Sequence, residues 1–437
     1  MNLVVLSLDG MSQTLFWQYR EALPTLWRFS NRSAMFRRFY AASTSALSSF
    51  CDVAYGDSTE LDHNTAYPSG PGCLAGKGKN LFGELRRRGY EMLGAQHGSH
   101  CPDYVKGNFW GAWPEECGAF QAHGEYESFY AATDSFLENA KAGAKPFVLY
   151  CSDRVALPGD TSKEKQEAVL YHERFEKGFS LLDRTAARVF DKLAALDLIK
   201  STLVVAYGPY GMDPWKHGVN RGRTTAIEPY ADLCWTPLFI YNNDNDICIA
   251  DQLFSSIDLR PTIMHMLFPQ ESREQPASPF TGIDILSFRR QIAFTQNLFS
   301  LERDNAGPAL GLLKSYAATD GDQRLVVTAD GNDSSGGMAL YYDPRDPGNT
   351  RNFLDFFTLA PNGAMAAFGR PDIIHPHFTM SFKPNLVMSV VNSYNTMREQ
   401  LFHFIRNKEQ AALALAGPEA KANIFPEVLF TRKRKRK

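Results

Sequence analysis

The chain has 437 residues, of which 44% are hydrophobic and 22% charged, with 46 basic side chains against 48 acidic ones. This composition is that of a folded globular protein, and it excludes a disordered chain, a collagen-like repeat and a disulfide miniprotein. The net charge of -2 gives no reason to expect nucleic acid as a partner. The sequence closes with six basic residues, Arg432 to Lys437, which are expected to form a solvated tail rather than an anion-binding or membrane-surface arm.

Cysteine usage and the shortness of the apolar segments indicate a reducing compartment. The seven cysteines are odd in number and form no Cys-x-x-Cys motif, which predicts buried thiols rather than a disulfide framework. The apolar run at residues 2–8 is too short for a signal peptide and lacks a basic segment before it. No stretch approaches about 18 continuous apolar residues, so no transmembrane helix is expected. We therefore predict a cytoplasmic protein.

Apolar runs alternate with helical periodicity along most of the chain. The elements predicted in order are strand 2–8, helix 24–36, helix 80–89, strand 91–94, helix 128–142, strand 145–151, helix 165–197, strand 201–207, strand 236–241 and helix 251–267. Strands and helices that alternate at this rhythm indicate parallel crossover connections. The predicted fold class is therefore α/β, with a mostly parallel central sheet and helices on both of its faces.

The pattern changes after about residue 310. Two hairpin strands are predicted at 323–328 and 338–342, around the turn sequence Asp330-Gly-Asn-Asp333. This change predicts a smaller C-terminal α+β subdomain. The expected domains are a large α/β domain, a smaller α+β subdomain and a basic tail, over residues 1–310, 311–425 and 426–437.

Candidate functional residues follow the predicted parallel strands, because chemistry in such sheets gathers at the carboxyl ends of the strands. This rule selects Asp9, His97 and the segments 152–158 and 208–211. Within the first of these segments, Asp153 and Arg154 are interpreted as an ordinary solvated loop pair.

A series of short motifs has an order found in one protein family. The motifs are Leu6-Ser-Leu-Asp9-Gly10, Pro24 to Ser30 followed by Phe39 to Ala42, Leu85 to Tyr90 followed by Gly94 to His97, Ser201 to Gly208, Ile257 to Thr262 and Leu340 to Asn352. In this order, over most of residues 2–355, the sequence resembles the sulfatases of the alkaline-phosphatase superfamily. The resemblance implies the family's α/β fold. It also implies its chemistry, in which a nucleophile and a divalent cation act on sulfate or phosphate esters.

The family's metal ligands are mostly replaced in this sequence. The usual Asp-Asp pair reads Asp9-Gly10, and the second ligand pair reads Pro209-Tyr210. The resemblance therefore leaves Asp9 as the candidate metal ligand. One carboxylate is too few oxygen ligands for Mg²⁺ or Ca²⁺, which take about six. No cofactor is expected, and any divalent cation would lie near Asp9.

The family's nucleophile is also missing. Its position, ten residues before the helix-ending Gly56, is occupied by Ala46, and the Cys-x-Pro-Ser-Arg signature is absent, which excludes a formylglycine mechanism. Thr44 and Ser45 are close enough to act as shifted nucleophiles, although hydroxyls at such positions also serve as helix caps. His97 corresponds to a family histidine and completes the candidate catalytic set, with a hydrogen-bonded structural histidine as the alternative.

A basic segment follows the altered loop at 208–211. Lys216, His217, Arg221 and Arg223 are candidates for an anion-binding pocket without metal, since guanidinium groups bind sulfate and phosphate oxygens in pairs. The alternative is a basic surface loop. This cluster suggests an anionic small molecule as a partner, while a protein partner and an oligomeric state remain open.

Three functional hypotheses follow from the sequence. The first is an ordinary metal-dependent sulfatase, and the second is a metal-independent ester hydrolase or transferase that uses a shifted Ser or Thr. The third is a sulfatase-like protein that has lost catalysis and acts as a binding or assembly module. Scaffold motifs persist while the site residues are replaced, so the third hypothesis is favoured and the second is its alternative.

Overall fold

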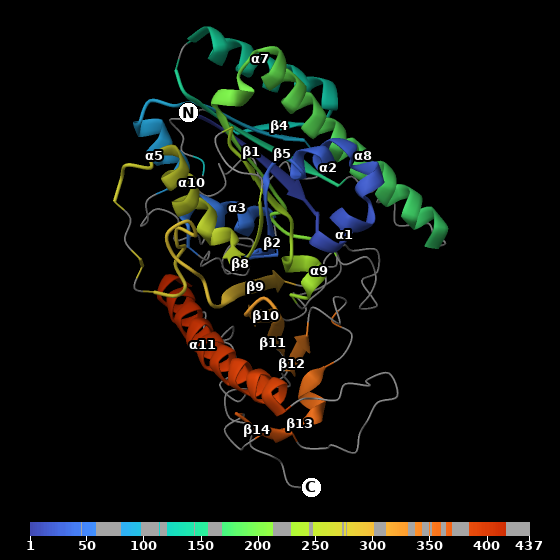
Figure 1. The fold of residues 1–437 in the computed structure, drawn as a ribbon, viewed down its shortest axis with the longest axis vertical. Coiled ribbons are helices and arrows are strands. Elements are labelled where there is room, and N and C mark those ends of the chain that lie inside the picture. The colour runs from blue at the N-terminus through green and yellow to red at the C-terminus, as the bar shows by residue number, and fades with distance from the viewer. Residues whose placement is uncertain are drawn as a thin grey trace.

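Figure 1 shows the computed structural model of the whole chain, with the described elements as ribbons. The structure describes residues 1–44, 46–57, 80–97, 113, 120–143, 145–155, 168–212, 229–243, 248–272, 275–276, 278–300, 312–330, 337–342, 349, 352–359, 364–368 and 384–416. Within these residues, no helix is both long enough and apolar enough to cross a bilayer. Three of the described cysteines are buried free thiols, as predicted, and Cys248 is an exposed one.

The larger sheet has eight strands in the order β4-β3-β5-β1-β6-β7-β2-β8. Their bounds are β1 (Asn2–Asp9), β2 (Ala34–Tyr40), β3 (Glu91–His97), β4 (Gln121–His123), β5 (Phe147–Arg154), β6 (Thr202–Tyr207), β7 (Leu238–Tyr241) and β8 (Ile249–Ser255). The pairings β1 with β5 and β6, β3 with β4 and β5, and β2 with β8 are parallel, while β7 runs antiparallel to both of its neighbours. The predicted fold class, a mostly parallel α/β sheet, is confirmed.

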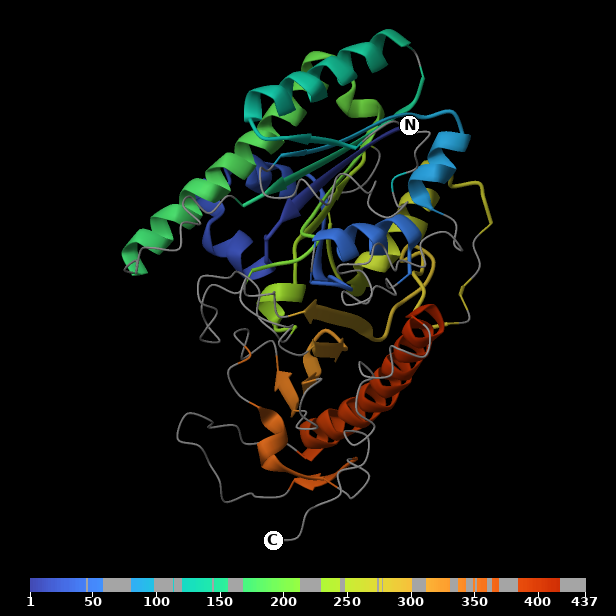
Figure 2. The same cartoon turned by 180° about the vertical axis from the view of Figure 1, so that it is seen from behind.

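Helices cover both faces of this sheet. They are α1 (Gln13–Gln18), α2 (Pro24–Ser30), α3 (Ala46–Tyr55), α5 (Leu81–Arg87), α7 (Tyr126–Gly143), α8 (Ala168–Ala195), α9 (Ala231–Cys234) and α10 (Leu259–Leu267), with 3₁₀ turns η1 (Arg20–Ala22), η3 (Ile199–Ser201) and η4 (Ser256–Asp258). Helices α3, α5 and α10 pack into one hydrophobic cluster, and α1, α2, α7 and α8 pack into another on the opposite face. Figure 2 shows these two layers from behind, with the sheet between them.

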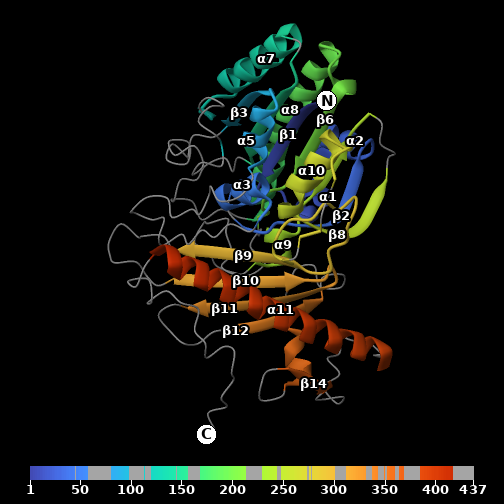
Figure 3. The ribbon, with the colours of Figure 1, turned by 90° about the vertical axis from the view of Figure 1, so that its left-hand side faces the viewer.

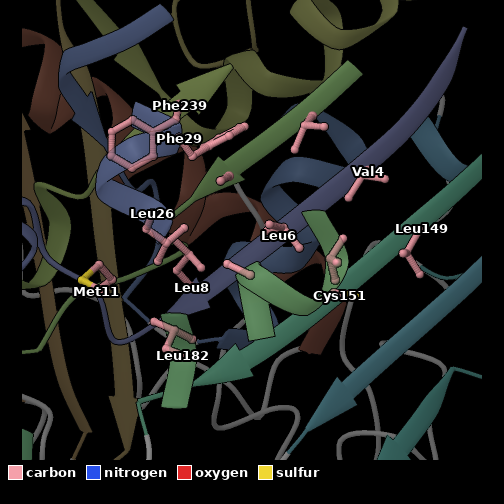
Figure 4. Close-up of a cluster of buried hydrophobic side chains, with 14 of the residues drawn as sticks. Val4, Leu6, Leu8, Met11, Leu26, Phe29, Leu149, Cys151, Leu182 and Phe239 are labelled. Atoms are coloured by element: carbon pink, nitrogen blue, oxygen red, sulfur yellow. The ribbon is translucent and has the colours of Figure 1, made fainter. Parts of the chain in front are cut away.

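Strand β1 illustrates how the sequence fills both layers. Leu3 and Val5 belong to the cluster with α3, whereas Val4, Leu6 and Leu8 belong to the cluster with α2 and α8 (Figure 4). Successive side chains of a strand point to opposite faces, so a strand covered on both faces is apolar at most of its positions. This is why the continuous apolar run at 2–8 correctly predicts a central strand.

A second sheet stands beside the larger one. Strands β9 (Ala293–Ser300), β10 (Leu312–Thr319), β11 (Gln323–Asp330) and β12 (Gly337–Tyr342) form it in the order β12-β11-β10-β9 with antiparallel pairing, which confirms the predicted hairpin. Helix α11 (Pro384–Ala416) lies across it (Figure 3), and β13 (Phe357–Leu359) pairs with β14 (Met365–Phe368) after the turn η5 (Phe353–Phe356). Strand β9 precedes residue 310, the expected boundary, and the division into domains stays a prediction.

Two predicted helices are partly wrong. The helix expected at 24–36 ends at Ser30, and residues 34–40 instead form β2. The helix expected at 251–267 begins as strand β8, and the helix α10 starts only at Leu259. In both cases the apolar residues lie in β2 and β8, which pair with each other in the sheet. Tertiary pairing thus overrides local helix propensity at these segments.

Candidate functional site

The carboxyl ends of five neighbouring strands lie along one edge of the larger sheet, in the order β4, β3, β5, β1, β6. His97 on β3 is in register with His123 on β4, and Asp9 on β1 is in register with Arg154 on β5. The sheet therefore gathers polar side chains from distant parts of the sequence at this edge, as predicted from the strand order.

Asp9 is the best-defined of the predicted site residues. Its side chain is 2% exposed, and its Oδ1 accepts hydrogen bonds from Ser7 Oγ at 2.8 Å and from Ser152 Oγ at 3.3 Å. Burial raises the pKa of Asp9 to about 7, against the opposing effects of the two hydroxyls and of the Arg154 charge. Asp9 therefore lies in surroundings that do not strongly favour a carboxylate charge.

The neighbours of Asp9 on the same face are phenols. The hydroxyls of Tyr150 and Tyr207 lie 3.2 Å apart, and both side chains are buried. Burial raises the pKa of both tyrosines well above the ordinary value, so they remain neutral near pH 7. The described surroundings of Asp9 thus include several neutral hydroxyl groups, and the buried carboxyl group of Asp52 also acts on Tyr207.

The described residues around Asp9 do not supply the ligand set that the divalent cation implied by the resemblance requires. Within the described part of the chain, no three His, Cys, Asp or Glu side chains are grouped to hold a metal ion. After β6, Pro209 supplies no side-chain ligand, and the Gly208 carbonyl accepts a hydrogen bond from Thr236 Oγ1 at 2.6 Å. Two hydroxyl donors already point at Asp9 Oδ1. Such donors stabilise a lone carboxyl group, whereas Mg²⁺ or Ca²⁺ needs several oxygen acceptors.

The helix expected to carry the nucleophile is present, and it lies at the expected place in the sequence, directly before Gly56. Helix α3 begins at Ala46 and ends before Gly56, whose φ of +65° is the left-handed conformation typical of a helix-ending glycine. Thr44 is buried just before it, and Ser45 lies outside the described residues. Ser49 is committed to a hydrogen bond from its Oγ to the Ser43 carbonyl at 2.8 Å. The roles of Thr44 and Ser45 stay predictions.

His97 lies on the opposite face of the sheet from Asp9. Its Nδ1 is 3.2 Å from Asp153 Oδ1, and its ring stacks on Tyr126 of α7 with 3.5 Å between the ring centroids. The structure therefore does not bring His97 together with Asp9, although both belong to neighbouring strand ends.

Asp153 is a residue that the sequence analysis named but interpreted as part of a solvated loop. It was expected in a solvated loop, but β5 continues through it, and its side chain is 2% exposed. Its Oδ2 accepts a hydrogen bond from Thr185 Oγ1 of α8 at 2.5 Å, and Oδ1 is also 3.5 Å from the Tyr126 hydroxyl. The expectation was wrong because helices α7 and α8 cover the strand end. The available signal was its place at the carboxyl end of a buried strand.

His123 lies beside His97 on the edge strand β4. Both imidazole rings are close to the ring of Phe129, with centroid distances of 6.1 Å for His97 and 5.9 Å for His123. His123 Nε2 is buried and has no hydrogen-bond partner among the described residues. Burial, and then the neighbouring His97, lower the pKa of His123. The sequence interpretation did not select this residue, because the three-residue strand gives no periodic pattern.

The predicted anion-binding cluster cannot be placed. Lys216, His217, Arg221 and Arg223 all lie outside the described residues, as does the basic tail. Their contribution to a pocket stays a prediction.

Comparison with solved structures identifies known proteins with a similar fold. A 2-O GAG sulfatase matches with a TM-score of 0.63 and 14% identity, covering 97% of this chain and 96% of that chain. The putative sulfatase yidJ from Bacteroides fragilis matches with a TM-score of 0.61 and 14% identity, covering 97% and 98%. An alkaline phosphatase superfamily protein from Vibrio parahaemolyticus matches with a TM-score of 0.54 and 14% identity, covering 80% and 84%. No protein-family model and no curated protein matches the sequence.

These likenesses define the class of fold. The central, mostly parallel sheet, the helical layers and the appended antiparallel sheet together form a sulfatase-like fold. At 14% identity they show the fold alone, and function has to be argued from the site.

Proposed function

We propose that this chain is a sulfatase-like protein that does not catalyse metal-dependent ester hydrolysis and acts as a binding or assembly module. The observation that carries this proposal is the environment of Asp9. Its carboxyl group is buried among hydroxyl groups, with a pKa of about 7, at the position where the family's first metal ligand is expected.

Electrostatics support this proposal. A divalent cation lowers the pKa of the carboxylates that bind it and is held by several of them. Without an ion, burial favours the neutral form of Asp9. A buried carboxyl group that receives two hydroxyl donors is stable without an ion and needs none to satisfy it.

The start of α3 supports the same proposal. Family chemistry requires a nucleophilic atom at this helix start, and the methyl group of Ala46 supplies none. Without that atom, no covalent intermediate can form at this position. The fold would then retain a shaped strand edge for ligand binding but not for turnover.

The alternative function is a metal-independent ester hydrolase or transferase that uses Thr44 or Ser45. The pairing of His97 with Asp153 favours it, because a carboxylate that fixes one imidazole nitrogen leaves the other for general acid–base chemistry. It is the weaker proposal, since His97 faces α7 and α8 whereas α3 packs on the other side of the sheet. The proposed ligand in either case is an anionic small molecule or a protein, in a cytoplasmic setting.

Turnover assays test the proposal directly. Purified protein is incubated with 4-nitrophenyl sulfate, 4-nitrophenyl phosphate and bis(4-nitrophenyl) phosphate, with and without Mg²⁺ or Ca²⁺. We expect no turnover above that of an Asp9→Asn variant, and no calorimetric binding of either ion. We also expect thermal stabilisation by sulfate or phosphate anions, as a binding module would show.

Two results would instead support one of the two enzyme hypotheses. Turnover that requires Mg²⁺ or Ca²⁺ and is lost in Asp9→Asn would overturn the proposal in favour of a metal-dependent enzyme. Turnover without metal that is lost in Ser45→Ala and kept in Ser49→Ala would establish the metal-independent alternative.

A further inference from the structure

Two histidines stand side by side at the β3–β4 edge of the larger sheet. His97 and His123 are register partners on adjacent parallel strands, so their side chains project from the same face, with backbones about 4.8 Å apart. Both rings are near Phe129 of α7, which confirms that they lie on the α7 side. This pair belongs to neither the Asp9 site nor the start of α3.

Each histidine has a ring nitrogen without a hydrogen-bond partner among the described residues. Within the described chain, His97 hydrogen-bonds through Nδ1 to Asp153, and no described residue hydrogen-bonds its Nε2. His123 Nε2 is buried and likewise lacks a partner among the described residues. A buried imidazole nitrogen without a partner is costly, and such groups in native proteins call for an explanation.

Asp153 gives His97 the environment of a metal ligand. Ligating histidines commonly donate their other ring N–H to a carboxylate, which fixes the tautomer and the ring orientation. Asp153 does this for His97, and Thr185 Oγ1 in turn holds the second carboxylate oxygen at 2.5 Å. Stacking on Tyr126 fixes the ring plane as well. The side chain of His97 is 12% exposed, so it is not completely enclosed by the described residues.

We propose that His97 and His123 form a two-imidazole site for a divalent transition-metal ion such as Cu²⁺, Ni²⁺ or Zn²⁺, with water in the remaining coordination positions. The site differs in position and chemistry from the cation site that the family implies. Imidazole nitrogens select these borderline ions, whereas Mg²⁺ and Ca²⁺ require oxygen ligands. This inference does not rest on the proposed function, because it concerns other residues on the other face of the sheet.

The test uses the full chain without an affinity tag and the metal ion alone as the probe. Cu²⁺, Ni²⁺ and Zn²⁺ are titrated by calorimetry, and the Cu²⁺ complex is studied by electron paramagnetic resonance. We expect binding in the order Cu²⁺ tighter than Ni²⁺, and a spectrum with nitrogen hyperfine structure. His123→Ala should lower the affinity for Cu²⁺ at least 10-fold, and Asp153→Asn should lower it about 10- to 100-fold.

The chain offers a matched control in His265. This histidine also pairs with a buried aspartate, with Nδ1 2.6 Å from Asp284 Oδ2, but it lies on helix α10, where no strand pairing aligns a second histidine with it. His265→Ala should leave the Cu²⁺ affinity within 2-fold of wild type. His123→Ala changes an edge strand, so its thermal unfolding is measured alongside to check that the variant is folded.

The proposal is overturned if His123→Ala binds Cu²⁺ as tightly as wild type does, or if His265→Ala weakens binding as much. It is also overturned if wild-type protein binds none of the three ions. Asp153→Asn is not needed for this decision, so a failure of that variant to fold leaves the test intact.

Discussion

The pH dependence of stability gives the sharpest test of the Asp9 environment. Asp9 has a pKa of about 7 in the folded protein against an ordinary value of 3.8. The folded state therefore binds this proton more tightly than the unfolded state does. Its contribution to stability is fully present below pH 3.8 and is lost as the pH rises through about 7. Three pKa units correspond to about 4 kcal/mol of lost stability above pH 7.

An Asp9→Asn variant removes this ionisation while keeping the shape of the side chain. The amide oxygen still accepts from Ser7 and Ser152, but the amide N–H₂ group has to find acceptors, which costs about 1–3 kcal/mol. That cost is the same at every pH, so it cancels when the stability difference between variant and wild type at one pH is compared with that at another. Between pH 5 and pH 8, the unfolding free energy of the variant relative to wild type should therefore rise by about 3 kcal/mol.

Urea unfolding at pH 5 and pH 8 measures this difference. Asp134→Asn is the control, because Asp134 forms a surface ion pair with Arg188, and such pairs contribute about 1 kcal/mol or less. Its relative stability should change little between the two pH values. If the stability of Asp9→Asn relative to wild type does not rise between pH 5 and pH 8, the pKa of Asp9 in the native protein is close to its ordinary value, and the reasoning is refuted. If the variant instead loses relative stability at pH 8, a cation or other positive charge holds the carboxylate, and the argument against a metal site fails.

Three further substitutions test individual buried contacts of the structure, and the free energy of unfolding of each variant is measured in urea at pH 7. Arg290→Met should cost about 3–5 kcal/mol, because it leaves the fully buried Asp258 carboxylate without its guanidinium partner. Thr185→Val should cost about 1–3 kcal/mol by removing the donor to Asp153. Gly208→Ala should also destabilise by about 1–3 kcal/mol, since its Cβ would lie 2.4 Å from the Met11 carbonyl oxygen. Wild-type stability in any of the three would show that the corresponding contact is absent in solution.

The sequence predicted the central sheet well because its strands carry their own signal. Residues 2–8 and 201–207 are apolar on both faces, and only a buried strand accommodates that pattern. The ends of elements were less predictable. Residues 34–36 continue a helical apolar pattern, and their strand conformation depends on pairing with β7 and β8, which no local window contains.

The candidate site was predictable in its location but not in its contacts. Strand order alone placed Asp9 and His97 at the carboxyl edge, and the structure finds both there. The partners of His97 come from β5, α7 and α8, so Asp153, Tyr126 and Thr185 could be assigned to it only after the helices were placed. A carboxylate such as Asp153 appears as a solvated loop residue whenever the element that covers it is unknown.

The alternation of side chains along β3 explains why His97 and Asp9 are separated. Leu93 and Ala95 belong to the core on the α7–α8 side, and His97 continues that row. Gly94 faces the other layer, where an added Cβ would lie 2.4 Å from the ring of Phe120. That aromatic packing fixes the register of the strand, because a shift by one residue would drive a side chain into it. His97 is thus held away from the Asp9 face by the core itself. Any activity that needs both residues in one site would require β3 to change its register.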